Sequence, residues 1–253
     1  MSNVKINHYK DIIKMKIQRY RKESDVTYAL GATVVMEYLN NRPELVKGVI
    51  LHPQFRAEET IEKINAITTE RKIPVTTEEK PFNILSQKEN CFVIAVIEKV
   101  ERELEKGDHV VLVNPSNAGN MGTIMRSCVG FEIMNMAVIK PAVDVFDPKT
   151  IRASMGAAAR INVRTFDSFD EYRALYKENN MYPFMLDGST KLQNTEIKAP
   201  FSLIFGNEAT GLPVDFQNIG QPIRIEHGHG IDSLNLPIAA SIALYSAAGG
   251  RFV

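Results

Sequence analysis

The chain has 253 residues, 44% of them hydrophobic and 24% charged, so it is long enough for two globular domains and too apolar for a disordered protein. Thirty Lys and Arg residues balance thirty Asp and Glu residues, and the net charge therefore favours neither a nucleic acid nor a membrane as partner. With two cysteines and only short apolar stretches, we expect a cytoplasmic protein with no disulfide framework, zinc cluster or membrane partner.

The basic charge is concentrated at the start of the chain. Residues 1–22 hold seven Lys or Arg side chains and one acid, Asp11. Apolar side chains recur at spacings of three and four from Tyr9 to Tyr20, which predicts an amphipathic helix. Its charged face is either simply solvated or contacts phosphate groups. On the second interpretation, the contacting residues are Lys10, Lys14, Arg19, Arg21 and Lys22.

Helices and strands alternate after this segment. Helical patterns cover residues 31–40 and 57–71, and apolar runs typical of strands cover residues 46–51, 73–76 and 91–97. This alternation predicts a small α/β domain over residues 1–98. Residues 99–107 are highly charged and end at a glycine, so we expect a linker there.

The second half of the chain repeats the alternation. The expected strands are residues 109–113, 134–139, 182–186, 201–205 and 222–225, and the expected helices are residues 119–129, 148–153, 169–179 and 234–248. Apolar strands joined by crossover helices predict a mostly parallel sheet, covered on both faces, in a second α/β domain over residues 108–253. Ligands of such sheets bind at the carboxyl ends of the strands.

Three polar segments that contain glycine follow predicted strands: residues 114–126, 203–213 and 223–241. Each is ordinary when taken alone. The first could simply cap a helix and matches neither the dinucleotide fingerprint nor a P-loop. Glu208 in the second could equally be a cap, and Ser233 in the third is a plausible N-cap for the last helix.

In this order, the three segments resemble the three motifs of the TrmH/SpoU family of RNA methyltransferases in the SPOUT superfamily. The first motif runs from Asn120 to Arg126, the second is Gly206-Asn-Glu-Ala-Thr-Gly-Leu212, and the third is Ser233-Leu-Asn235. The resemblance spans about residues 109–250. More weakly, residues 16–31 resemble the start of the family's ribosomal-protein-like substrate-binding domain, and residues 150–157 resemble a stretch common in relatives.

The resemblance implies a C-terminal domain with a deep trefoil knot that holds S-adenosylmethionine, in a homodimer whose active site lies near the subunit interface. It implies no metal, and it makes the basic front segment an RNA-binding surface. By motif position, the catalytic residues are Asn120, Arg126, Glu208, Ser233 and Asn235. The residues that match or adjoin cofactor-contacting positions are Asp187, Gly188, Phe205, Gly206, Asn207, Ile225 and Leu234.

The implied reaction transfers a methyl group from a sulfonium to a ribose 2′-hydroxyl of RNA, so the enzyme must align the two and remove a poorly acidic proton. In the family, the arginine at the position of Arg126 is proposed to activate the hydroxyl, but an arginine stays protonated at nearly any accessible pH. Alternatively, Arg126 binds the adjacent phosphate and stabilises the developing alkoxide, while a phosphate oxygen, Glu208 or water takes the proton.

The sequence departs from the family where Pro-Met usually precedes the third motif, because Glu226-His227 stands there. His227 and His229 suggest a metal site, but no third ligand is evident. We expect instead that the change alters the lining of the cofactor pocket or introduces pH sensitivity.

Ribosomal RNA is the expected substrate, because the basic helix and the ribosomal-protein-like domain suit recognition of folded RNA by its shape and 2′-hydroxyls. Transfer RNA is the alternative. A non-catalytic knotted protein in RNA binding or ribosome assembly would keep the fold but lose the polar motif residues, all of which are present: Asn120, Arg126, Glu208 and Asn235. A dehydrogenase would need the diglycine fingerprint, which is missing.

Overall fold

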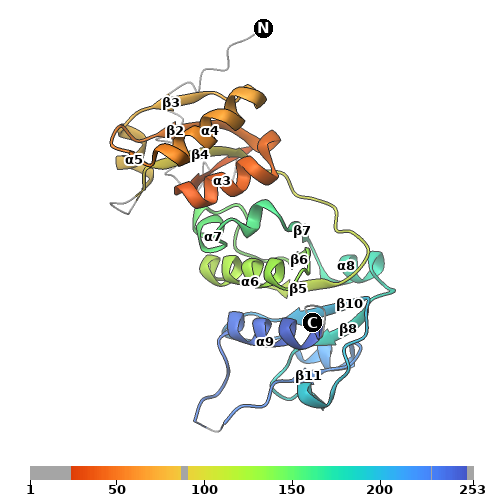
Figure 1. Cartoon of the computed structure of the whole chain (residues 1–253). Coiled ribbons are helices and arrows are strands. Elements are labelled where there is room, and N and C mark those ends of the chain that lie inside the picture. Colours follow the sequence, from red (N-terminus) through yellow and green to blue (C-terminus); the bar gives the residue numbers. More distant parts are fainter. Residues whose placement is uncertain (1–23, 87–90, 229, 250–253) are drawn as a thin grey trace. The chain divides into compact units, whose positions relative to one another are not determined.

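A computed structural model of the chain describes residues 24–86, 91–228 and 230–249. It divides into two compact units (Figure 1). The first comprises Met1–Val100 and Phe146–Arg160, and the second comprises Glu101–Val145 and Ile161–Val253. None of the described helices combines the length and the hydrophobicity that crossing a membrane requires.

The first unit contains a four-stranded sheet in the order β1-β4-β2-β3, in which β4 is antiparallel to both neighbours and β3 is parallel to β2. Its strands are β1 (Val26–Leu30), β2 (Val46–Leu51), β3 (Val75–Thr77) and β4 (Val93–Glu98). Alternate side chains of the strands enter two cores, one with α3 (Ala32–Asn41) and α4 (Glu58–Arg71), the other with α5 (Lys80–Leu85).

The segment Phe146–Arg160 packs in the first unit, although the predicted division placed it in the second. It contains α7 (Pro148–Ala153), whose Ile151 is buried in the core with α3 and α4. Arg160 forms an ion pair with Glu37 of α3 at 2.8 Å. The predicted extent of the second domain, residues 108–253, therefore needs correction at this segment, because local sequence pattern does not show which of two cores a short helix joins.

The second unit contains a five-stranded sheet in the order β7-β6-β5-β10-β8, with every pair parallel. Its strands are β5 (His109–Val113), β6 (Asn135–Ile139), β7 (Asn162–Phe166), β8 (Asn180–Pro183) and β10 (Phe201–Phe205). A bridge between Phe184 and Ile223 continues the sheet into a small parallel pair, β9 (Thr190–Lys191) and β11 (Ile223–Arg224).

Both faces of this sheet are covered. The core on one face includes Phe169 and Tyr172 of α8 (Phe169–Leu175). The helices α6 (Ala118–Gly130) and α9 (Leu236–Ala248) pack against each other, and their side chains Ser127 and Ser241 are joined by a hydrogen bond of 2.8 Å. The strand β10, which lies between β5 and β8, is buried along its whole length, as expected for a parallel sheet.

The predicted linker is partly docked on the second unit. Arg102 N donates a hydrogen bond to Val163 O of the edge strand β7 at 3.0 Å. The carboxylate of Glu101 accepts hydrogen bonds from Thr165 N at 2.8 Å and from Thr165 Oγ1 at 2.6 Å. These contacts cover a sheet edge whose backbone groups would otherwise be open to pairing with other chains.

Some elements differ from the sequence-based expectation. The strands β1 and β7 and the helix α5 were not predicted, and α8 ends at Leu175 rather than at residue 179. The reason for the early end is visible at Asn179, whose side-chain amide donates to Gly107 O and Phe201 O. These bonds hold the segment after α8 against the sheet.

A buried chain of hydrogen bonds lies at the amino end of this sheet. Asn179 donates to Ser202 Oγ at 3.1 Å, and Ser202 lies 2.6 Å from the Tyr172 hydroxyl. His109 Nδ1 lies 2.9 Å from the same hydroxyl, and Nε2 lies 2.8 Å from Glu105 O. Because a carbonyl only accepts, the His109 proton is on Nε2 and Tyr172 donates to Nδ1. Burial lowers the pKa of His109.

We expect the free energy of unfolding to fall as the pH is lowered from 7.5 to 5.5. The unfolded chain protonates His109 near its ordinary pKa of about 6.5, whereas the folded chain resists protonation, so acid favours the unfolded state. One such group contributes at most about 1.4 kcal/mol per pH unit. Urea unfolding at the two pH values should show a smaller difference for His109→Gln than for wild type; equal differences would contradict this role.

Candidate functional site

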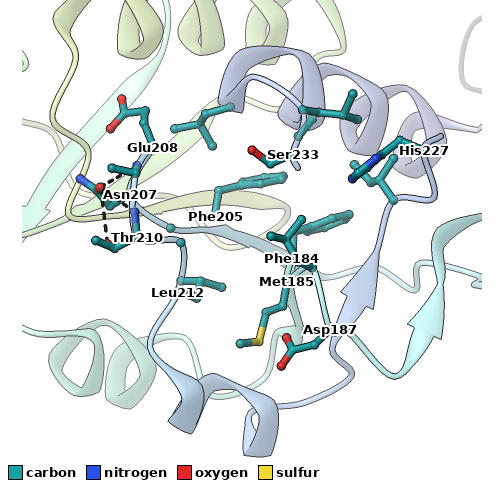
Figure 2. A pocket seen from close by; sticks show the side chains of 18 residues that line it. Phe184, Met185, Asp187, Phe205, Asn207, Glu208, Thr210, Leu212, His227 and Ser233 are labelled. Carbon is teal, nitrogen blue, oxygen red and sulfur yellow. Dashed lines mark hydrogen bonds between the residues drawn. The ribbon is translucent and has the colours of Figure 1, made fainter. Parts of the chain in front are cut away.

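A pocket of about 420 Å³ lies at the carboxyl ends of β8 and β10, the edge of the sheet at which parallel sheets bind ligands (Figure 2). Its walls come from residues 184–187 after β8, residues 205–212 after β10, Ile225 and His227 after β11, and Ser233, Leu234, Leu236 and Ala239 at the start of α9. The predicted site residues in this lining are Asp187, Phe205, Gly206, Asn207, Glu208, Ile225, Ser233 and Leu234.

The loop after β10 doubles back tightly on itself. Asn207 and Gly211 form an isolated bridge, with hydrogen bonds of 3.2 and 2.9 Å between their backbones. A Cβ atom on Gly206 would lie 2.1 Å from the Gly211 carbonyl carbon and 2.3 Å from Leu212 N. Only glycine at position 206 permits this close approach of backbone to backbone.

Asn207 ties this loop to the end of β5. Its Nδ2 donates to Asn114 O at 2.8 Å, while its Oδ1 accepts from Ala209 N at 2.9 Å and Thr210 N at 3.2 Å. The side chain is thus fully engaged in holding two loops together. The first two motif segments are brought together in this way, as the resemblance predicts.

Glu208 is the second tie between these segments. Its Oε2 accepts hydrogen bonds from Ser116 N at 3.0 Å and Ser116 Oγ at 2.7 Å, and its Oε1 accepts from Asn117 N and Asn120 Nδ2, both at 3.1 Å. Partial burial alone would raise the pKa of Glu208, but the hydrogen bonds from Ser116 and Asn120 outweigh it and lower the pKa. A carboxylate held by four donors is a poor proton acceptor.

We expect Glu208→Gln to disturb the loop of residues 116–120 although the side chains have similar shapes. An amide has one acceptor oxygen, so its NH₂ group must face at least one of the four donors. The lost hydrogen bonds cost on the order of 1–3 kcal/mol of stability. Thermal unfolding and methyl-transfer rate should both decrease. A variant with wild-type stability and reduced rate would instead indicate that Glu208 acts in the chemistry.

The third motif begins α9 differently from the prediction. The N-cap of α9 is Asn235, not Ser233, because Pro237 lies at the second helical position, where a proline is tolerated. Ser233 lines the pocket, whereas Asn235 is exposed and does not. The predicted cap at Ser233 was therefore wrong by two residues, and the serine is left facing the cavity.

Arg126 and Asn120 lie on the same helix but in different surroundings. Asn120, in the first turn of α6, is half-buried and bonded to Glu208. Arg126 is exposed almost two turns later and does not line the pocket. Among the described residues, no hydrogen-bond or ion-pair partner of its guanidinium is found. The structure thus brings Asn120 to Glu208, but it does not bring Arg126 to the pocket of its own chain.

Asp187 and Gly188 have different roles in the turn after β8. Asp187 lines the pocket, and its carboxylate accepts a hydrogen bond from the side-chain amide of Gln217. Gly188 packs behind the pocket, where a Cβ would lie 2.5 Å from the Ile223 carbonyl carbon. Gly188 was predicted to contact the cofactor, but it does not line the pocket, and its close contact is with the backbone of Ile223.

Several pocket residues were not predicted. Phe184 stacks on Phe205, with ring centroids 4.7 Å apart and planes 17° apart, and both rings line the pocket. His227, which was not among the predicted cofactor-binding residues, also lines it, in keeping with the expectation that Glu226-His227 alters the lining. Phe184 was missed because it lay in the middle of the predicted strand 182–186, whereas β8 ends at Pro183 and Phe184 follows it directly, at the edge where such sheets bind ligands.

The predicted RNA-binding residues Lys10, Lys14, Arg19, Arg21 and Lys22 lie outside the described part of the chain. His229 lies outside it as well. Among residues 24–86, 91–228 and 230–249, no three His, Cys, Asp or Glu side chains come together in a group that could hold a metal ion.

Comparison with known proteins identifies the family. The sequence model of the SpoU rRNA methylase family matches residues 108–245, more than half of the chain. The chain belongs to this family. Membership confirms the predicted reaction class, S-adenosylmethionine-dependent 2′-O-ribose methylation of RNA, and the predicted fold class.

Individual relatives differ in how much of the chain they match. A 23S rRNA (guanosine(2553)-2′-O)-methyltransferase of Bacillus subtilis (strain 168) is 24% identical, and the match covers 98% of this chain and 99% of the relative. A protein of the same organism, provisionally assigned as a tRNA (cytidine(34)-2′-O)-methyltransferase, is 30% identical over 55% of this SpoU-family chain and 90% of the relative.

Among solved structures, the S-adenosylmethionine-bound rRNA methyltransferase of Sinorhizobium meliloti matches with a TM-score of 0.80 at 25% identity. The match covers 94% of this chain and 92% of that one. Both units of the SpoU-family chain therefore have counterparts in a known methyltransferase.

Proposed function

We propose that this chain methylates a ribose 2′-hydroxyl of ribosomal RNA, with S-adenosylmethionine held in the pocket beside β10 and α9. The observation that carries the proposal is the convergence of the motif segments. Glu208 and Asn207 connect the first two segments, and Ser233 of the third lines the same pocket.

The pocket fits the chemistry of this donor. The stacked rings of Phe184 and Phe205 offer an apolar aromatic wall, which suits the flat adenine ring. The carboxylates of Asp187 and Glu208 supply negative charge, which suits a cationic sulfonium and an ammonium group. When bound, the cofactor supplies an electrophilic methyl group. A volume of about 420 Å³ is within the usual range for sites of small ligands.

We assign separate roles to three polar residues of the reaction site. Arg126 binds the RNA phosphate and stabilises the developing alkoxide, because an exposed and permanently charged guanidinium can do both. Asn120 and Glu208 hold the loop that carries the start of α6. Since Glu208 is occupied by four donors, the 2′-hydroxyl proton passes to a phosphate oxygen or to water.

The extent of the matches favours ribosomal RNA over transfer RNA. The relative assigned to transfer RNA matches only about half of this chain. The relative that acts on 23S rRNA matches nearly all of it, including the first unit. If the first unit selects the RNA, its presence points to a ribosomal substrate.

We further propose that two copies pair through α9. The side chains of Ile238, Ile242 and Tyr245 are 54%, 38% and 75% exposed, and their spacings of four and three place them on one face of the helix. An apolar stripe of this kind favours burial against a partner. Pairing also agrees with the resemblance, which implies an active site near a subunit interface, and with the absence of Arg126 from the pocket lining of its own chain.

A charge on this stripe should separate the dimer. We expect Ile242→Glu to shift the protein from dimer to monomer in analytical ultracentrifugation, because a buried unpaired carboxylate is strongly unfavourable. Leu175→Glu on α8 is a matched control, since Leu175 is also exposed, at 55%. A wild-type monomer, or an Ile242→Glu variant that remains dimeric, would contradict pairing through this face.

The RNA substrate is tested by mapping ribose methylation across total RNA from cells with and without the gene. We expect one 23S or 16S rRNA position to lose its methyl group in the deletion strain and to regain it with the wild-type chain. Restoration by wild type but not by Arg126→Ala would link the mark to this site. Loss of a mark confined to transfer RNA would refute the ribosomal assignment and leave the reaction class intact.

A further inference from the structure

The segment that departs from the family pattern forms part of the pocket wall. β11 ends at Arg224, and residues 225–228 follow it without regular secondary structure. Ile225 and His227 line the pocket. Arg224 and Glu226 are not part of the lining and form an ion pair with each other at 3.7 Å. His227 therefore lies at the pocket, while the charged residue before it is paired outside the lining.

Ion pairing on the opposite side holds this segment in place. Glu226 forms an ion pair with Lys191 of β9 at 2.7 Å and accepts a hydrogen bond from the side-chain amide of Gln193. These contacts join the residue before His227 to the neighbouring strand. They restrain the backbone at residue 226, where the family usually has a proline. The His227 ring stays on the cavity side.

The hydrogen bond of the His227 ring determines which nitrogen is free. Nδ1 lies 3.1 Å from Gly228 O, and because a carbonyl only accepts, Nδ1 carries the proton of the neutral ring. Nε2 then carries a lone pair, for which no donor is found among the residues that the structure describes. Figure 2 shows His227 on the side of the pocket near Phe184, away from Glu208 and Asn207. The pocket thus has a hydrogen-bond acceptor beside its aromatic wall.

We propose that His227 is a specificity residue of the cofactor pocket, with Nε2 accepting a hydrogen bond from the exocyclic amine of adenine. The inference rests on the proposed function, which places S-adenosylmethionine in this pocket. The aromatic wall of Phe184 and Phe205 suits the purine, and the exocyclic amine is the donor on that ring. An inosine ring has an acceptor oxygen at this position and cannot make the bond.

Calorimetric binding of two ligands to the full-length chain tests the inference. S-adenosylhomocysteine carries the amine, and S-inosylhomocysteine carries an oxygen in its place. We expect wild type to bind the adenosine ligand between about twofold and tenfold more tightly, the range of one net hydrogen bond. His227→Phe keeps a ring of similar size, and it should lose this preference by binding the adenosine ligand more weakly. His227→Gln, which retains an acceptor, should recover part of the preference.

The outcomes separate this inference from the proposed function. If wild type binds S-adenosylhomocysteine but His227→Phe keeps the full preference for adenosine, the role of His227 is refuted and the cofactor site stands. If His227→Phe loses affinity for both ligands equally, the residue only shapes the pocket, and the inference is refuted. If wild type binds neither S-adenosylhomocysteine nor S-adenosylmethionine, the proposed function fails, and the inference fails with it.

Discussion

Replacing Arg126 with alanine should reduce methyl transfer by about a hundredfold to a thousandfold, the usual cost of removing one donor that stabilises charge in a transition state. Binding of S-adenosylmethionine should change less than twofold, because Arg126 does not line the pocket. The fold should also be unaffected, since the side chain is exposed. The measurements are the single-turnover methylation rate on ribosomal RNA and the calorimetric affinity for the cofactor.

Two further variants sharpen this test. Arg126→Lys keeps the charge but loses the planar fork that matches a phosphate, so we expect it to recover only a small part of the rate. Thr123→Ala changes the same helix one turn earlier, where the exposed hydroxyl donates to Gly119 O of its own helix, and it should retain nearly the full rate. A rate for Arg126→Ala within threefold of wild type would remove the residue from the mechanism.

The sequence was most informative where both faces of a strand are buried. The strands β5 and β10 are almost continuous apolar runs, so their positions and the loops that follow them could be predicted well. The carboxyl ends of parallel strands share one edge of the sheet. The contacts of Asn207 and Glu208 with the loop before α6 could therefore be predicted from the positions of the strands. The polar edge strand β7 lacks such a run and was missed.

Features set by tertiary contacts could not be predicted. The packing of Ile151 in the first unit depends on which core has room for it. The four donors around Glu208 depend on the exact path of the loop at Ser116, so residue types alone left its role as proton acceptor open. The position of Arg126 outside the pocket could not be predicted either. Motif spacing placed the residue on α6, but it did not show how far that part of the helix lies from the cavity.

Gly206→Ala should abolish binding of S-adenosylmethionine. The added Cβ would lie 2.1 Å from the Gly211 carbonyl carbon, 2.3 Å from Leu212 N and 2.4 Å from Gly211 O. These are backbone atoms, which cannot move aside as a side chain can. The loop of residues 206–212 must therefore open, and that loop forms one wall of the pocket. We expect a loss of about 3 kcal/mol in stability, which corresponds to a fall of roughly 6–12 °C in Tm.

Gly228→Ala separates this effect from the general cost of changing a glycine near the pocket. Gly228 follows His227, which lines the cavity, but does not line it itself, and a Cβ there would have no atom within 4 Å among the described residues. We expect its Tm and cofactor affinity to match wild type. Thermal unfolding and calorimetry of both variants check the argument. If Gly206→Ala bound the cofactor normally, the tight return of the chain after β10 would not be what forms the site, and the placement of the cofactor would have to be revised.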